Sequence, residues 1–162
     1  MRLDNLELFS TQGGKIDLST VEGRSVVFVY PRTSPLGGAP EGWEMIPGAK
    51  GCTAESCSFR DLHEDFLQLQ TRVFGVSTQD TGYQQEAAKR LHLSYPLLSD
   101  ARLQLKEQLG LETFDFEGQR LYRRATFLIE DGMVLERFTE IGDPAAHPNQ
   151  VLQVIAQKYR ES

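Results

Sequence analysis

The sequence predicts a mixed α/β fold, with a central β-sheet covered by helices on both faces. Three observations favour this fold class. Short apolar runs alternate with amphipathic helical patterns, two of these runs are apolar at nearly every position, and the chain closes with a hairpin signal and a last helical pattern. A strand that is apolar at consecutive positions is typical of a sheet buried on both faces. The length of 162 residues fits one domain, so we expect a single domain over residues 1–162.

The first part of the chain predicts a hairpin, a buried strand and a long loop. Residues 6–18 alternate loosely around Gly13-Gly14, which favours a short hairpin. Residues 25–30 read Ser-Val-Val-Phe-Val-Tyr and predict a strand buried on both faces. Residues 35–51 are rich in glycine and proline and contain the only tryptophan, Trp43, so we expect a loop there. Structureless loops of this length are commonly functional.

The middle of the chain alternates helices with strands. Apolar residues at helical spacing predict an amphipathic helix over about 53–70, and a second buried strand follows at 72–77. A further helix is expected near 82–92, then a short strand at 96–99 and a short helix at 103–109.

The last part predicts a hairpin followed by a helix. Residues 125–129 and 134–138 are strand-like and flank Asp131-Gly132, a dipeptide typical of tight hairpin turns. A final helix is indicated by four apolar residues that share one helical face: Val151, Leu152, Ile155 and Tyr159.

Composition and charge exclude several classes of function. The chain has 17 basic and 23 acidic residues, a formal charge of −6, which lacks the positive surface that binding to nucleic-acid phosphates requires. No apolar run of about 18 residues is present, so we expect no membrane segment. The N-terminus, Met1-Arg2-Leu3-Asp4, lacks the apolar stretch of a secretory signal, and we expect a cytoplasmic protein.

The two cysteines, Cys52 and Cys57, form the one possible thiol pair. In the cytosol, where thiols stay reduced, such a pair is more typical of reactive thiols than of a structural disulfide. If Cys52 is the N-cap of the predicted helix, Glu55 occupies position N3 and can bond back to the cap. The helix terminus favours an anion, so we expect the pKa of the Cys52 thiol to be lowered. Glu55 opposes this effect unless a nearby guanidinium pairs with it.

Helix geometry keeps these two cysteines apart. Positions i and i+5 of an α-helix lie roughly 8.5 Å apart between Cα atoms, beyond the ~7 Å limit for an unstrained disulfide. The sulfurs can therefore bond only if the first turns of the helix unwind, which predicts a redox switch. The alternative is that Cys57 is a buried helix cysteine and Cys52 a loop residue without a role.

Five short segments share a pattern and an order with one known family. They are residues 27–31 (Val-Phe-Val-Tyr-Pro), 51–61 (Gly-Cys-Thr-Ala-Glu-Ser-Cys-Ser-Phe-Arg-Asp), 74–77 (Phe-Gly-Val-Ser), 95–100 (Tyr-Pro-Leu-Leu-Ser-Asp) and 124–129 (Arg-Ala-Thr-Phe-Leu-Ile). Together they resemble the peroxiredoxins, and most closely their bacterioferritin-comigratory, or Q-type, subgroup.

The resemblance implies a thioredoxin fold and a thiol-dependent peroxidase acting on hydrogen peroxide and organic hydroperoxides. It implies no cofactor and no metal, and a thioredoxin or glutaredoxin-like reductant. Cys52 corresponds to the peroxidatic cysteine, Cys57 to the resolving cysteine, and Arg124 to the arginine that orients peroxide. Arg124 fits the family pattern Arg-x-Thr-Phe, whereas Arg123 is one step off, and one step along a strand reverses the face. We expect a monomer or a weak homodimer.

The chain departs from the family pattern before Cys52. The family motif Pro-x-x-x-Thr-x-x-Cys has six residues between proline and cysteine, whereas twenty residues separate Pro31 from Cys52. We take Pro31, which ends the strand, as the motif proline, and we expect Pro31 and Glu55 to line the peroxide site. Thr33 or Ser34 then supplies the hydroxyl that bonds peroxide.

The inserted loop has two interpretations. It forms a lid over the pocket, with Trp43 and Met45 as an apolar wall, or it is a surface insertion without a role.

The histidines carry no metal motif. We expect His63 and His92 to be exposed on helices and His147 to lie in the loop before the last helix. No His or Cys spacing in the chain is typical of a metal site.

Two other functions compete with a peroxidase. One is a thiol–disulfide oxidoreductase or redox sensor that uses Cys52 and Cys57 without peroxide turnover, although such proteins usually carry Cys-x-x-Cys. The other is a non-enzymatic interaction module of thioredoxin fold, in which both cysteines are dispensable.

Overall fold

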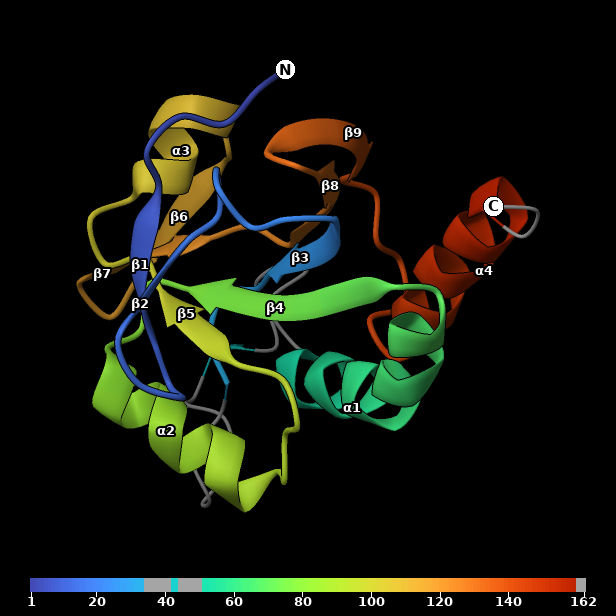
Figure 1. The fold of residues 1–162 in the computed structure, drawn as a ribbon. Helices are drawn as coiled ribbons and strands as arrows, with labels where there is room; N and C mark the ends of the chain where they lie inside the picture. The colour runs from blue at the N-terminus through green and yellow to red at the C-terminus, as the bar shows by residue number, and fades with distance from the viewer. Residues whose placement is uncertain (34–41, 44–50, 160–162) are drawn as a thin grey trace.

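The structure is a computed structural model that describes residues 1–33, 42–43 and 51–159. Helices alternate with strands from β3 to β6, whereas strands follow one another from β1 to β3 and from β6 to β9 (Figure 1). The strands are β1 (Glu7–Ser10), β2 (Lys15–Asp17), β3 (Arg24–Val29), β4 (Thr71–Ser77), β5 (Leu97–Ser99), β6 (Thr113–Phe116), β7 (Gln119–Tyr122), β8 (Ala125–Glu130) and β9 (Met133–Phe138). The helices are α1 (Cys52–Gln68), α2 (Thr81–Arg90), α3 (Gln104–Leu109) and α4 (His147–Tyr159).

A seven-stranded mixed sheet forms the centre of the fold, in the order β2-β1-β5-β4-β3-β8-β9. Its middle strands β3, β4 and β5 run parallel, and the other pairings are antiparallel. The parallel strands are connected through α1 and α2, as crossover connections require. This mixed sheet confirms the predicted fold class.

The central strands β3, β4 and β8 are buried on both faces. Successive side chains of each strand point to opposite sides, and each side meets a packed layer. In β3, Val26 and Phe28 pack with α1 and α4, whereas Val27 and Val29 pack with α3 and the β1–β2 hairpin. Figure 1 shows α1 and α4 together on one side of the sheet and α3 on the other. The near-continuous apolar run of β3 is explained by these two layers.

The predicted elements are found close to their expected bounds, and one hairpin was missed. Strands β6 and β7 form a separate two-stranded sheet with a turn at Glu117-Gly118. Both turn residues have positive φ angles, 50° and 75°, as a type I′ turn requires. The strands are short and only partly buried, so their apolar pattern is weak, and Gly118 is the one signal that could have revealed the hairpin.

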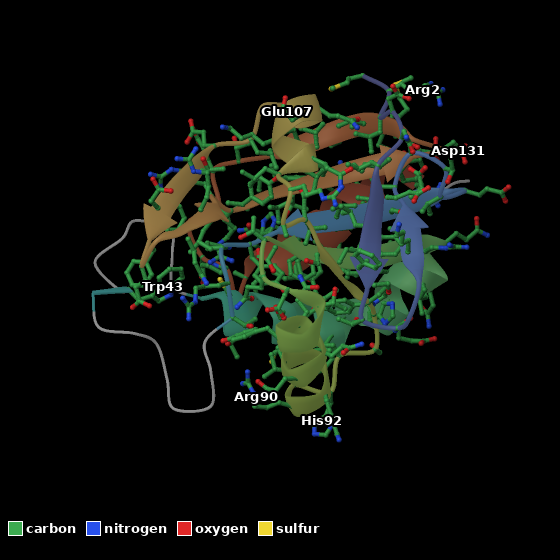
Figure 2. The ribbon with its side chains drawn as sticks, turned by 90° about the vertical axis from the view of Figure 1, so that its left-hand side faces the viewer. Arg2, Trp43, Arg90, His92, Glu107 and Asp131 are labelled. Atoms are coloured by element: carbon green, nitrogen blue, oxygen red, sulfur yellow. The ribbon has the colours of Figure 1, made fainter. Side chains whose placement is uncertain are left out.

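Trp43 packs on this β6–β7 hairpin (Figure 2). Its ring centroid lies 4.9 Å from that of Phe116 and 6.1 Å from that of Phe114, and the side chain is buried. The Arg32 guanidinium lies 5.6 Å from the indole centroid. Trp43 therefore packs on the hairpin, while Met45 lies outside the described residues.

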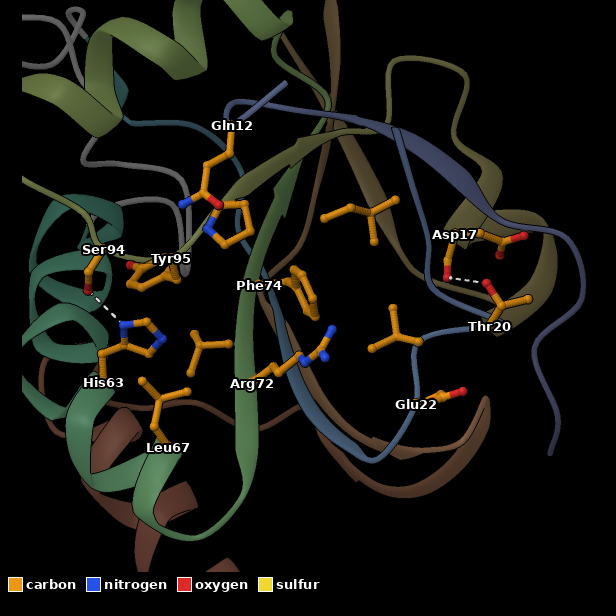
Figure 3. A pocket seen from close by; sticks show the side chains of 14 residues that line it. Gln12, Asp17, Thr20, Glu22, His63, Leu67, Arg72, Phe74, Ser94 and Tyr95 are labelled. Carbon is orange, nitrogen blue, oxygen red and sulfur yellow. Dashed lines mark hydrogen bonds between the residues drawn. The ribbon is translucent and has the colours of Figure 1, made fainter. Parts of the chain in front are cut away.

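A groove of about 550 Å³ opens where β5 is shorter than β4 (Figure 3). The β4 edge forms its floor, with α1 on one side and the β1–β2 hairpin on the other. β5 begins at Leu97, directly after Pro96, and Pro96 has no N–H to donate to β4. Cys52 is not among the residues that line this groove.

None of the helices in the described residues has the length and apolar character that a membrane crossing requires.

Gly75 in β4 generates a stability prediction. A Cβ atom there would lie 2.7 Å from Leu97 Cδ2 and 2.8 Å from Phe28 Cζ. We expect Gly75→Ala to lower the free energy of unfolding by about 1–3 kcal/mol through overpacking, as measured by urea denaturation. Gly82→Ala is the control, since its Cβ would meet nothing closer than 3.4 Å. A helical alanine there should be neutral or stabilising, by at most about 1 kcal/mol. Equal losses in the two variants would contradict this account.

Candidate active site

The first turn of α1 begins one residue earlier than predicted. Gly51, not Cys52, is the N-cap, with φ of 101° in the left-handed region. Glycine adopts this left-handed conformation without strain. It is also favoured here because a Cβ atom would lie 2.8 Å from Pro144 Cγ. Cys52 is therefore the first helical residue, and the expected bond from Glu55 back to the cap does not form. The Glu55 N–H instead donates to the Gly51 carbonyl, 2.8 Å away.

Donors from two other segments meet the Cys52 sulfur. Nη2 of Arg124 lies 3.3 Å from Sγ, and the backbone N–H of Arg32 also donates to it. Sheet register explains this meeting, because Val29 pairs with Ala125 and so sets the residues after β3 beside the start of β8. The Cys52 side chain is only 3% exposed.

Arg124 also pairs with Glu55. Its Nη1 lies 2.5 Å from Oε1 of Glu55, and both side chains are buried. One planar guanidinium thus bridges the carboxylate and the thiol with two of its N–H groups. The neighbouring Arg123 points elsewhere and forms an exposed pair with Glu112 at 3.6 Å.

Burial dominates the acid–base behaviour of this cluster. It raises the pKa of the Cys52 thiol above its ordinary value, although Arg124 and the Arg32 N–H favour the thiolate. It likewise raises the pKa of Glu55, against the opposing effect of Arg124. The lowered Cys52 pKa expected from the helix terminus is wrong for this closed arrangement, because desolvation outweighs the favourable charges. One cation serves two acids here, so ionising one of them disfavours ionising the other.

The other predicted pocket residues lie around the end of β3. Pro31 is buried and directly precedes Arg32. Thr33 is also buried, and both its N–H and its hydroxyl engage Oε1 of Gln79, at 3.1 and 3.4 Å. Tyr83 donates its hydroxyl to the Thr33 carbonyl. Ser34, the second hydroxyl candidate, lies outside the described residues.

Cys57 lies in the second turn of the same helix. Both cysteines are present as thiols, and Cys57 is half-buried. Because α1 is helical without interruption from Cys52 to Gln68, the i, i+5 separation applies, and a disulfide requires the helix to open.

Comparisons with known proteins agree with this geometry. The Redoxin family model matches residues 2–155. A relative from Mycobacterium tuberculosis that is named as a peroxiredoxin is 30% identical over 135 residues, covering 83% of this chain and 79% of the relative. This chain belongs to the peroxiredoxins.

Relatives and solved structures extend this result. Peroxiredoxin Bcp of Bacillus subtilis is 29% identical over 161 residues, covering 95% of this chain and 94% of the relative. Chloroplastic peroxiredoxin Q of Oryza sativa subsp. japonica is 27% identical over 152 residues, which are 93% of this chain and 63% of the rice protein. The chain thus spans 63% of the length of that relative. The crystal structure of peroxidoxin BcpB from Mycobacterium tuberculosis superposes with a TM-score of 0.76 at 29% identity, covering 97% of this chain and 95% of that one.

A buried histidine beside the site of this peroxiredoxin was not foreseen. His147 begins α4 rather than lying in a loop, and its Nε2 is 2.8 Å from Oγ1 of Thr126. Its ring packs edge-on against Phe59 and Phe138. The only sequence signal is its position at the start of the last helical pattern.

The other two histidines differ in exposure. His63 was expected to be exposed but is half-buried, with Nδ1 2.7 Å from the Ser94 hydroxyl. His92 is exposed, beyond the end of α2 (Figure 2). Over the described ranges, no cluster of three His, Cys, Asp or Glu residues is placed to hold a metal ion.

His147 generates a prediction for acid stability. Burial, together with the Arg124 charge, lowers its pKa from 6.5 to about 4. The unfolded chain therefore binds more protons than the folded protein between these values, and stability falls as the pH drops from about 6.5 to about 4. The slope is at most about 1.4 kcal/mol per pH unit. We expect His147→Gln to flatten the dependence of the unfolding free energy on pH in this window.

The control for this experiment is His92→Gln, which removes an exposed histidine. Its pH dependence should match that of the unmodified protein in urea titrations between pH 4 and 7. An equally steep acid loss in His147→Gln would show that this histidine is not the group responsible.

Proposed function

We propose that this chain is a thiol-dependent peroxidase that reduces hydrogen peroxide and organic hydroperoxides at Cys52. One observation carries the proposal: the Cys52 sulfur, at the first position of a helix, receives hydrogen bonds from Arg124 and from the Arg32 backbone. Donors aimed at one sulfur favour its thiolate, and the thiolate is the nucleophile that attacks peroxides.

The first step is the attack of the Cys52 thiolate on the terminal oxygen of ROOH. An S–O bond forms, the O–O bond breaks, and the RO⁻ group leaves with a proton as an alcohol, or as water when the substrate is hydrogen peroxide. The sulfur is oxidised to sulfenic acid, Cys52–SOH, and the peroxide is reduced. Arg124 and the Cys52 backbone N–H stabilise the charge that develops on the two oxygens. Glu55 acts as a positioning residue, since it holds the guanidinium.

The second step forms a disulfide. The Cys57 thiol attacks the sulfenic sulfur, an S–S bond replaces the S–O bond, and water leaves with the thiol proton. The first turns of α1 open for this step, because the intact helix keeps the sulfurs too far apart. A dithiol of the thioredoxin or glutaredoxin type then reduces the disulfide by exchange.

We further propose that the chain acts in the cytoplasm as a single unit over 1–162, either as a monomer or as a weak homodimer. The proposal is supported by the cysteine content, since a single pair, Cys52 and Cys57, is more typical of reactive thiols in a reducing compartment than of a structural disulfide. Thr33, or Ser34 outside the described residues, is proposed to contact the bound peroxide.

The cysteine variants test the proposal. We expect Cys52→Ser to abolish peroxide consumption coupled to thioredoxin and thioredoxin reductase. Cys57→Ser should consume one peroxide per chain and then stop, because its sulfenic acid has no internal partner. A wild-type protein that reacts with peroxide no faster than a small free thiol does would instead indicate a thiol–disulfide oxidoreductase.

Two neighbouring arginines provide a matched test of the peroxide step. Arg124→Gln removes the donor to Cys52, and we expect the second-order rate of Cys52 oxidation to fall by roughly 10²–10³-fold. Arg123→Gln removes a charge that is paired at the surface and should leave this rate within about twofold of the wild type. Stopped-flow peroxide competition measures both rates. Similar rates in the two variants would remove Arg124 from the proposed mechanism.

A further inference from the structure

Besides the Glu55–Arg124 pair, a hydrogen bond from a tyrosine holds the segment between the two cysteines against the core. The Tyr95 hydroxyl donates to the carbonyl oxygen of Ser56 at 2.6 Å, and the bond is buried. Ser56 directly precedes Cys57 in α1. The bond therefore acts on the part of the helix that must open before Cys57 can reach Cys52.

Tyr95 is held firmly at its own end of this bond. Its side chain is 1% exposed, and its ring meets Phe28 of β3 edge-on, with centroids 5.6 Å apart. It also contacts the His63 ring at 5.7 Å, and His63 is bonded to Ser94, as Figure 3 shows. The chain then enters β5 at once, where Leu97 pairs with Gly75 of β4. Tyr95 thus belongs to the buried core.

The chemistry of Ser56 and Tyr95 shows how this hydrogen bond opposes opening of the helix. The Ser56 hydroxyl is buried and has no hydrogen-bond partner within the described residues, so opening the turn would let water satisfy it. The hydrogen bond from Tyr95 to the Ser56 carbonyl instead stabilises the closed helix. Burial raises the pKa of Tyr95 well above its ordinary value, so the hydroxyl keeps its proton and remains a donor.

We propose that Tyr95 is a positioning residue that holds the first turns of α1 closed through Ser56, and so sets how fast Cys57 resolves the oxidised Cys52. This inference rests on the proposed peroxidase function. In the open state Cys52–SOH and Cys57–SH combine to a disulfide and water. In the closed state a second ROOH can oxidise Cys52–SOH to the sulfinic acid, releasing ROH. Tyr95 therefore sets the division between recycling and overoxidation.

The test compares Tyr95→Phe with Tyr122→Phe. Both remove one buried hydroxyl that donates at 2.6 Å, but that of Tyr122 serves Asp100, away from α1. Reduced protein is mixed with excess hydrogen peroxide and quenched with acid. Mass spectrometry then follows the sulfenic, disulfide and sulfinic forms over time.

We expect Tyr95→Phe to form the disulfide about fivefold faster, the factor that corresponds to the loss of one neutral hydrogen bond. The sulfinic fraction should fall in the same proportion, while the rate of the first oxidation stays unchanged. In the reduced protein, amide hydrogens in the first turns of α1 should exchange about fivefold faster. Tyr122→Phe should leave the rate of disulfide formation, the sulfinic fraction and the amide exchange of α1 at their wild-type values.

An unchanged resolution rate in Tyr95→Phe, or an equal increase in Tyr122→Phe, would overturn the inference. Hydrogen exchange separates it from the proposed function, because that measurement requires no peroxide. If Cys52 failed to react with peroxide, the peroxidase proposal would fall, and unchanged exchange in Tyr95→Phe would refute the Tyr95 contact independently.

Discussion

The buried guanidinium of Arg124 is the interaction on which the site depends. It bridges Cys52 and Glu55, which come from the start of α1, while Arg124 itself directly precedes β8. The antiparallel pairing of β8 with β3 brings this arginine beside the residues that follow β3, where Arg32 supplies a backbone N–H. Three segments distant in sequence therefore meet at one sulfur because the sheet aligns them.

The buried Arg124–Glu55 pair contributes more to the position of the guanidinium than to the stability of the fold. Burying an ion pair costs desolvation energy that the attraction only partly offsets, whereas removing one partner leaves an uncompensated charge, at about 3–5 kcal/mol. Glu55 thus requires Arg124, and Arg124 is fixed in turn by Glu55. Because the guanidinium is shared, the thiol competes with a carboxylate for the same positive charge. Access of water to the cluster, rather than the helix terminus alone, then governs how much thiolate is present.

The sequence was sufficient for features that depend on local pattern and failed where tertiary burial decides. The strand at 25–30 and the helix after the loop were predicted closely because their apolar periodicity is strong. The start of α1 was misplaced by one residue, since the left-handed Gly51 is selected by contact with Pro144, which is remote in sequence. The Cys52 pKa and the burial of His147 likewise depend on neighbours that no local pattern identifies. The β6–β7 hairpin was missed because a Glu-Gly turn between half-buried strands is a weak signal.

The packing of Trp43 gives the molecule an intrinsic optical probe. It is the only tryptophan in the chain, so its emission comes from one defined place. The Arg32 guanidinium lies over its indole, and the backbone N–H of the same residue binds the Cys52 sulfur. Arg32 thus contacts both the Cys52 sulfur and the Trp43 indole, so that a change of charge or volume at the sulfur acts on a residue that touches the fluorophore. We therefore expect the fluorescence of Trp43 to respond to the oxidation of Cys52, without a dye and without altering the chain.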